Sequence, residues 1–287
     1  MPLTTIYGGG TKIINTTVGN SGIIQTLHPD VMQFIGVLGT AATPYAMTVQ
    51  EIDAINELVW GMEANGLWSK MQVVYPFIGS NSTAQSYNLK NTGTFQITWN
   101  TVASITFSTA NGMQKTSTNT AHGNTNYTPS TSQTLNNAHL SVYLGTAQSG
   151  IIVPMAAFTS PDRWLQINSS PPALNANIII QGASGVITSF ALPATNTGFI
   201  IGSRTSSTSS KAYYNGRLAA TNTTTATSNR PTVPVTIGIQ NNNGTPNQFP
   251  CTQAIRFASI GTGLNDIEAK ALTSIVQLYQ SKLGRQV

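Results

Sequence analysis

Two segments of the chain repeat apolar residues at the spacing of an amphipathic helix. Near residues 49–65, the apolar stripe consists of Ile52, Ile55, Val59 and Met62. Near residues 266–283, it consists of Ile267, Ala271, Ile275, Leu278 and Tyr279. Steps of three and four residues place such positions on one side of a helix, so each segment is predicted to be a helix with one buried face.

Both predicted helices carry start and stop signals. Thr48 with Glu51, and Asn265 with Glu268, have the spacing of a capping box. In this motif the side chains of the N-cap residue and of the third helical residue each accept a hydrogen bond from the other's backbone N–H. Gly66 and Gly284 stand where a left-handed stop is needed. The acids gathered in the first turns are therefore assigned to capping, to the positive end of the helix dipole and to solvation, rather than to catalysis.

Between the helices the pattern changes to alternation, which is typical of strands with one face in a core and one facing water or another layer. The clearest alternating runs are 95–99, 140–144 and 235–239. Further candidate strands lie at 104–107, 164–167, 178–180, 198–202 and 256–260. The strongest hairpin signal is Asn215-Gly216, because this pair tolerates the positive φ angles of a type I′ turn. Many strands without alternating helices predict a mainly β protein, an antiparallel β-sandwich or jelly roll flanked by the two helices.

Residues 1–47 differ from the rest and are predicted to be an N-terminal arm for anchoring or subunit docking, while residues 48–287 form the sandwich domain. The arm contains three consecutive glycines and an uncharged stretch at 31–47, with little periodicity of its own. A disordered leader is the alternative interpretation. The stretch at 31–47 is shorter than the roughly 20 apolar residues that span a bilayer, so no transmembrane segment is expected. The first residues lack the pattern of a signal peptide, so synthesis in the host cytoplasm is expected.

Composition adds a shortage of charge. Only 7% of the residues are charged, whereas ordinary globular domains have about 25%. Between Ala64 and Asn265 the sequence has a single acidic residue, Asp162. A surface wetted by hydroxyls and amides suits extracellular β-structures, fibres and virion proteins. The net charge of +5 reflects the shortage of acids, and because the Lys and Arg residues form no run, specific nucleic-acid recognition is not expected.

The same shortage argues against most site chemistry. A glycosidase needs two carboxyl groups beside the scissile bond, and Asp162 has no acidic neighbour in the predicted sandwich. A serine triad through His139 and Asp162 lacks the Gly-x-Ser-x-Gly elbow, so His139 is interpreted as a hydrogen-bonded structural residue. Cys251 is the only cysteine and the histidines have no ligand spacing, so no metal or cofactor site is expected beyond a weak calcium site at Asn175 or Asn177.

Glycan binding remains compatible with this composition, because it needs aromatic platforms and amide or hydroxyl groups rather than acids. The candidate carbohydrate-binding residues are Trp164, Tyr213, Tyr214 and Asn215. Packing in the core or across strands is the competing interpretation of the three aromatic residues.

Several segments resemble a known family. The Tyr-Tyr-Asn-Gly-Arg-Leu stretch at 213–218 looks like the hairpin of concanavalin A-like (laminin G-like) sandwich domains. The segments 255–261, 263–269 and 283–287 resemble the C-terminus of tailed-bacteriophage virion proteins that bear this domain, and 64–71 followed by 75–79 is similar to their N-terminal helix and its exit. The resemblance covers residues 48–287 and implies a concanavalin A-like sandwich. No binding residue is carried over, because the acids that lectin members use for metal and sugar are absent here.

These observations favour a non-enzymatic bacteriophage virion structural protein on the particle surface, such as a capsid decoration, fibre or tail component. Its expected partners are other copies of itself and other virion proteins. The alternative is a receptor- or carbohydrate-binding adhesin module on the virion that recognises a host-surface glycan. A glycoside hydrolase centred on Asp162 is the remote alternative.

Overall fold

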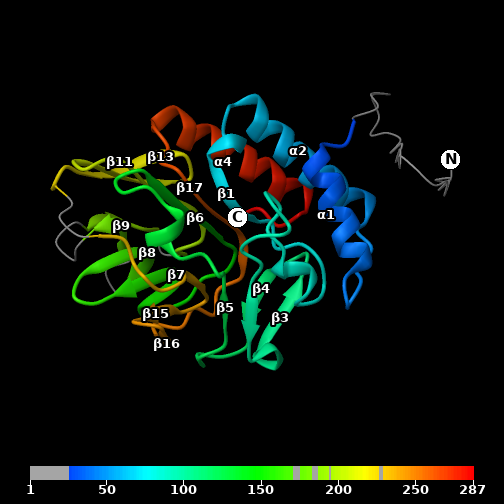
Figure 1. The fold of residues 1–287 in the computed structure, drawn as a ribbon, viewed down its shortest axis with the longest axis horizontal. Coiled ribbons are helices and arrows are strands. Elements are labelled where there is room, and N and C mark those ends of the chain that lie inside the picture. The colour runs from blue at the N-terminus through cyan, green and yellow to red at the C-terminus, as the bar shows by residue number, and fades with distance from the viewer. Residues whose placement is uncertain (1–25, 171–174, 183–186, 194, 226–228) are drawn as a thin grey trace.

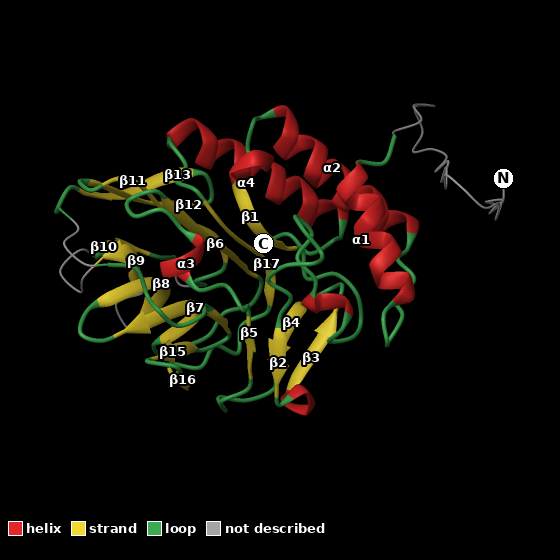
Figure 2. Cartoon of the chain, in the orientation of Figure 1, coloured by secondary structure: helices red, strands yellow, loops and turns green. Residues whose placement is uncertain are grey.

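The structure, a computed structural model, describes residues 26–170, 175–182, 187–193, 195–225 and 229–287. Its elements form three layers (Figures 1 and 2): helices cover one face of a β-sheet, here sheet I, and a second sheet, sheet II, packs against the other face. The described chain is therefore a mainly β sandwich with flanking helices, and the predicted fold class is confirmed.

Sheet I has the strand order β13-β12-β11-β6-β17-β4-β3, with β1 also paired to β17. Its strands are β1 (Met71–Tyr75), β3 (Ile105–Ser108), β4 (Gly112–Lys115), β6 (Ala138–Leu144), β11 (Gly198–Ser206), β12 (Ser209–Tyr214), β13 (Arg217–Asn222) and β17 (Ile255–Gly261). Every pairing in this sheet is antiparallel among the residues described.

Sheet II has the order β10-β9-β8-β7-β14-β5-β2, and the β15–β16 hairpin attaches to β7. Its strands are β2 (Thr98–Asn100), β5 (His122–Asn124), β7 (Ile152–Thr159), β8 (Arg163–Ser170), β9 (Asn175–Gly182), β10 (Thr188–Ala191), β14 (Thr236–Ile237), β15 (Gln240–Asn242) and β16 (Thr245–Gln248). The β15–β7 pair is parallel, and the other pairs given for this sheet are antiparallel.

The helices gather on the outer face of sheet I. They are α1 (Pro29–Thr40), α2 (Val49–Ala64) and α4 (Asp266–Lys282). The short helical segments are α3 (Pro129–Ser132), η1 (Trp68–Lys70), η2 (Ala84–Ser86) and η3 (Val102–Ser104). Helices α2 and α4 pack against each other, and α1 packs against α2 (Figure 1). None of the helices in the described ranges is long and apolar enough to cross a membrane.

The main core lies between the two sheets. Leu140 and Val142 of β6 and Ile178 and Ile180 of β9 are fully buried there. At Gly202 the sheets approach so closely that a Cβ atom would lie 2.3 Å from Ile178 Cγ2. A side chain at this position would push the layers apart, which explains the glycine inside strand β11.

A second core joins sheet I to the helices. It includes aromatic side chains from four neighbouring strands, Tyr143, Phe199, Tyr213 and Phe257, all buried. Every residue of β6 is buried, because its two faces meet sheet II and the helical layer. The polar-side positions of this strand, predicted to face water or another layer, face the helical layer.

The predicted capping boxes are both present. The Thr48 hydroxyl accepts a hydrogen bond from Glu51 N, and the Glu51 carboxylate accepts one from Thr48 N at 2.8 Å. Asn265 and Glu268 form the same reciprocal pair at the start of α4. Both helices are followed by a glycine with positive φ, 67° at residue 66 and 65° at residue 284. The local start and stop signals therefore set the helix ends as expected.

The expectation of little periodic structure in residues 1–47 is wrong for its second half. Residues 29–40 form α1, whose Val31, Phe34 and Leu38 are fully buried against the helical layer. These three residues have helical spacing, but Gln33 and Gly36 between them obscure it in the sequence. Residues 1–25 of the predicted arm lie outside the described residues.

Two of the predicted strands are shorter than expected. In 95–99, Phe95 has a φ of 53°, and in 235–239, Gly238 has a φ of 85°. Positive φ angles are incompatible with extended strand geometry, so only part of each run pairs in sheet II. Most apolar side chains of both runs still pack in or against the main core, which shows that their alternation reflects burial more than strand length.

Candidate functional site

The outer face of sheet II is turned away from the layer formed by α1, α2 and α4 (Figure 1). On this face, Phe158 of β7 and Trp164 of β8 lie directly opposite each other. Their ring centroids are 4.0 Å apart with an interplanar angle of 32°, and both side chains are half-buried. Cross-strand aromatic pairs of this kind hold each other in place and present a rigid apolar surface.

Asp162 fixes the orientation of the tryptophan ring. Its Oδ1 accepts a hydrogen bond from Trp164 Nε1 at 2.9 Å, across the turn between β7 and β8. The single acidic residue of the sandwich thus holds an aromatic ring in position. This interaction explains the presence of Asp162 structurally, without the catalytic role that the glycosidase alternative gives it.

Amide side chains border the aromatic pair on its β15 side. Asn242 pairs with Phe158 in the parallel β15–β7 ladder, and Asn243 N donates to Phe158 O at 3.0 Å. Asn243 Oδ1 accepts from Ser160 N at 2.6 Å, and its Nδ2 donates to Asn242 Oδ1 at 3.0 Å. The hairpin end of β7 and β8 is therefore tied to the β15–β16 turn through amide groups.

Gln166 lies two residues beyond Trp164 and faces the same side of the sheet. The side chain is 4% exposed, and its Oε1 has no hydrogen-bond partner among the described residues. A buried acceptor without a donor costs free energy.

The structure separates the other predicted binding residues from Trp164. Tyr213 is 1% exposed and lies on the face of sheet I that is covered by the helices. Its hydroxyl donates to Asp266 Oδ1 at 2.7 Å. Tyr214 is partly buried and packs against the main core, where its ring centroid lies 6.0 Å from that of Phe190. Both tyrosines therefore have packing roles in these positions.

Asn215 occupies the tip of the β12–β13 hairpin. Its φ is 47° and that of Gly216 is 79°, as in the predicted type I′ turn. The Asn215 side-chain oxygen accepts from Phe199 N at 2.8 Å, so the amide is engaged with the fold. Of the four predicted residues, only Trp164 lies on the outer face of sheet II.

All eight acidic residues lie in the described part of the chain, and each has a partner there. The pairs are Asp30 with Trp68, Glu51 with Thr48 and Tyr45, Asp53 and Glu57 with Lys282, Glu63 with His28, Asp162 with Trp164, Asp266 with Lys211 and Tyr213, and Glu268 with Asn265 and Lys70. Within the described ranges, no group of three or more His, Cys, Asp or Glu residues could hold a metal ion. The carboxylates act in caps, in ion pairs and in orienting two indole rings.

His139 is hydrogen-bonded at both ring nitrogens, which agrees with its predicted structural role. Nδ1 lies 2.7 Å from Thr262 O, and because a carbonyl only accepts, Nδ1 must carry the proton. Nε2 then accepts from Ser259 Oγ at 3.0 Å, and Ser259 Oγ accepts from Ser141 Oγ at 2.7 Å. Burial lowers the pKa of His139 to about 4, so the ring is neutral at pH 7.

Phe158 was not predicted from the sequence, because strand β7 was not recognised. The run at 151–158 is apolar without alternation and contains Pro154, which is unfavourable in most strands. The usable signal is symmetry about a turn: Phe158 and Trp164 are equally spaced from Pro161, as expected for opposite positions in a hairpin.

No protein-family model matches the chain, and no curated protein matches it. A carbohydrate-binding module, the CBM40 of a Ruminococcus gnavus IT-sialidase bound to α2,3 sialyllactose, is a similar solved structure at 16% identity, with a TM-score of 0.41 over 48% of this chain and 83% of that chain. A mutant of HCR/D is similar at 9% identity, with a TM-score of 0.51 over 72% of this chain and 52% of that chain. At such identities the likeness concerns the β-sandwich fold alone.

Proposed function

We propose that this chain is a non-enzymatic binding protein whose sandwich holds a neutral glycan on the outer face of sheet II. The observation that carries the proposal is the Phe158–Trp164 pair, with ring centroids 4.0 Å apart and the indole N–H held by Asp162. The C–H face of a sugar ring packs well on a rigid aromatic surface. Because two partners already hold the tryptophan, little side-chain entropy is lost when a ligand binds.

The polar groups around the pair support a neutral ligand. Sugar hydroxyls need both donors and acceptors, and the amides of Asn242 and Asn243 offer both. Asp162 is the single acid of the sandwich, and one of its oxygens is engaged by the indole. Charge therefore contributes little, and affinity would come from stacking and neutral hydrogen bonds.

We further propose that the module belongs to the surface of a tailed-bacteriophage virion, as a concanavalin A-like domain that assembles with copies of itself and with other virion proteins. Three of the segments that carry the family resemblance, 75–79, 255–261 and 283–287, are joined through Arg285, which supports treating them as parts of one motif. Its guanidinium donates to the carbonyls of Pro76 and Phe77 at 2.9 Å and to that of Arg256 at 2.7 Å. Labelled electron microscopy of particles that contain this chain tests the location, and unlabelled virions would contradict it.

A glycan array probed with the full chain tests the binding proposal. Wild type should bind at least one neutral glycan, and Trp164→Ala should weaken binding about thirtyfold, the equivalent of about 2 kcal/mol for a central aromatic contact. Trp164→Phe should retain part of the affinity, since it keeps an aromatic ring. Leu218→Ala changes an exposed apolar residue on β13 and serves as the control. Absence of neutral-glycan binding by folded wild type would favour a purely structural role.

A further inference from the structure

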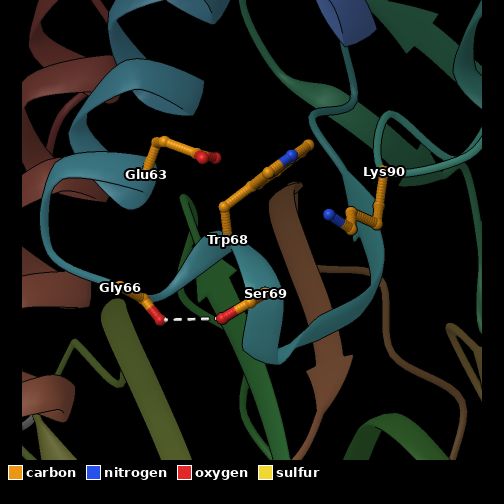
Figure 3. A pocket seen from close by; sticks show the side chains of 5 residues that line it. All are labelled: Glu63, Gly66, Trp68, Ser69 and Lys90. Carbon is orange, nitrogen blue, oxygen red and sulfur yellow. Dashed lines mark hydrogen bonds between the residues drawn. The ribbon is translucent and has the colours of Figure 1, made fainter.

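A second candidate site lies in the helical layer, at the C-terminal end of α2. Glu63, Gly66, Trp68, Ser69 and Lys90 line a cavity of about 180 Å³ (Figure 3). Drug-sized ligands occupy cavities of roughly 300 to 1,000 Å³, so this cavity fits a smaller molecule. Three of its residues belong to 64–71, a segment that stands out in the sequence and has no part in the glycan proposal.

Two opposite charges flank the tryptophan in this cavity. In Figure 3 the Glu63 carboxylate and the Lys90 ammonium lie on either side of Trp68. Lys90 Nζ lies 4.5 Å from the Trp68 ring centroid, and in the described part of the chain no carboxylate oxygen is within 4.0 Å of it. In the described ranges, the basic side chain within 4.0 Å of the Glu63 carboxylate is His28, whose Nε2 lies 3.8 Å from Glu63 Oε2. Both charges therefore retain capacity for a ligand.

The walls of the cavity are fixed by neighbouring groups. Trp68 is 3% exposed, and its indole N–H donates to Asp30 Oδ2 of α1 at 2.7 Å. The backbone N–H of Lys90 donates at 3.1 Å to Oδ1 of Asn88, a fully buried residue. Because these contacts exist without a ligand, the tryptophan wall and the backbone that carries Lys90 are set in advance. Such preorganisation lowers the free-energy cost of binding.

We infer that this cavity binds a zwitterionic small molecule of the size of a free α-amino acid. The ligand ammonium pairs with Glu63, the ligand carboxylate pairs with Lys90, and the rest of the molecule lies along the edge of Trp68. A ligand with one charge leaves either Glu63 or Lys90 without a partner, so the pair of charges selects for a zwitterion. The inference is independent of glycan binding on sheet II.

The test uses the full chain and a panel of free L-amino acids. Thermal shift identifies the best binder, and calorimetry compares it with the amine that lacks its carboxylate and the acid that lacks its ammonium. The zwitterion should bind at least tenfold more tightly than either analogue. Glu63→Gln and Lys90→Gln should each weaken binding at least tenfold, whereas Lys270→Gln, at an exposed lysine of α4, should not.

Three results would overturn the inference. The first is that folded wild-type protein, with its normal melting temperature, binds no free amino acid at millimolar concentration. The second is unchanged affinity in both Glu63→Gln and Lys90→Gln. The third is loss of amino-acid binding in Trp164→Ala, which would place the ligand on the outer face of sheet II instead.

Discussion

At the scale of single residues, several of the largest and most polar buried side chains are satisfied by the fold itself. Arg285 is 3% exposed and donates to main-chain carbonyls, while His139 is fully buried in a chain of hydrogen bonds with Ser259 and Ser141. Cys251 is also fully buried, and burial raises the pKa of its thiol to about 12. These residues stabilise the fold, and their chemistry predicts how stability responds to pH and mutation.

The neutral state of His139 predicts lower stability in acid. Its pKa is about 4 in the fold and about 6.5 when unfolded, so between these values the unfolded chain binds more protons. Stability should therefore fall as the pH drops from 6.5 to 4, with a contribution of about 2 kcal/mol between pH 7.5 and 5. Urea unfolding of His139→Gln should show a correspondingly smaller loss over this interval. Equal pH dependence in wild type and variant would contradict the assignment.

Arg285 should be one of the most sensitive positions in the chain. Arg285→Met keeps much of the stem but leaves the buried carbonyls of Pro76, Phe77 and Arg256 without this donor. We expect a loss of about 3 kcal/mol in the free energy of unfolding, measured by chemical denaturation. Arg217→Met, at an exposed position, should change it by less than about 0.5 kcal/mol. Similar losses for the two variants would show that the carbonyl contacts contribute little.

At the scale of elements, the sequence predicts best those structures whose signals are local. Helices α2 and α4 have caps and stop glycines within a few residues, and the β12–β13 turn depends on Asn215-Gly216. The predicted stripe of α4 is wrong at Ile267 and Leu278, which are 81% and 52% exposed. Strand β7 and helix α1 were missed because their identity depends on tertiary contacts: β7 is buried along most of its length, and α1 has the exposed Gly36 between its buried residues Phe34 and Leu38. For the same reason, Trp164 was predicted as a site residue and its partner Phe158 was not.

Helix α1 should dock as part of the folded domain. Phe34 is fully buried among the residues of α2 and the rest of the helical layer, so Phe34→Ala should leave a cavity there and lower the free energy of unfolding by about 3 kcal/mol. Hydrogen exchange of the amides in 29–40 should become faster in this variant. Met32→Ala, at a side chain 41% exposed, is the matched control. Unchanged exchange in Phe34→Ala would show that α1 does not depend on this contact.

At the scale of the whole molecule, the three layers leave two separate regions for binding. The outer face of sheet II carries an aromatic pair with neutral amides, and the helical layer carries a small cavity with two opposite charges. Seven of the eight acids lie in or beside the helical layer, where they form caps and ion pairs, and Asp162 alone belongs to the sandwich. The uneven distribution of acids therefore matches the division between the layers.

The most direct test of the central claim is a titration followed by the indole N–H signals in a nitrogen–proton correlation spectrum. The chain has four tryptophans, so three of the signals are internal controls, and Trp164→Phe assigns the fourth. With the best neutral glycan from the array, the signal of Trp164 should shift while those of Trp60, Trp68 and Trp99 stay in place. A bound glycan that shifts another indole and leaves Trp164 unchanged would contradict the proposed site on the outer face of sheet II.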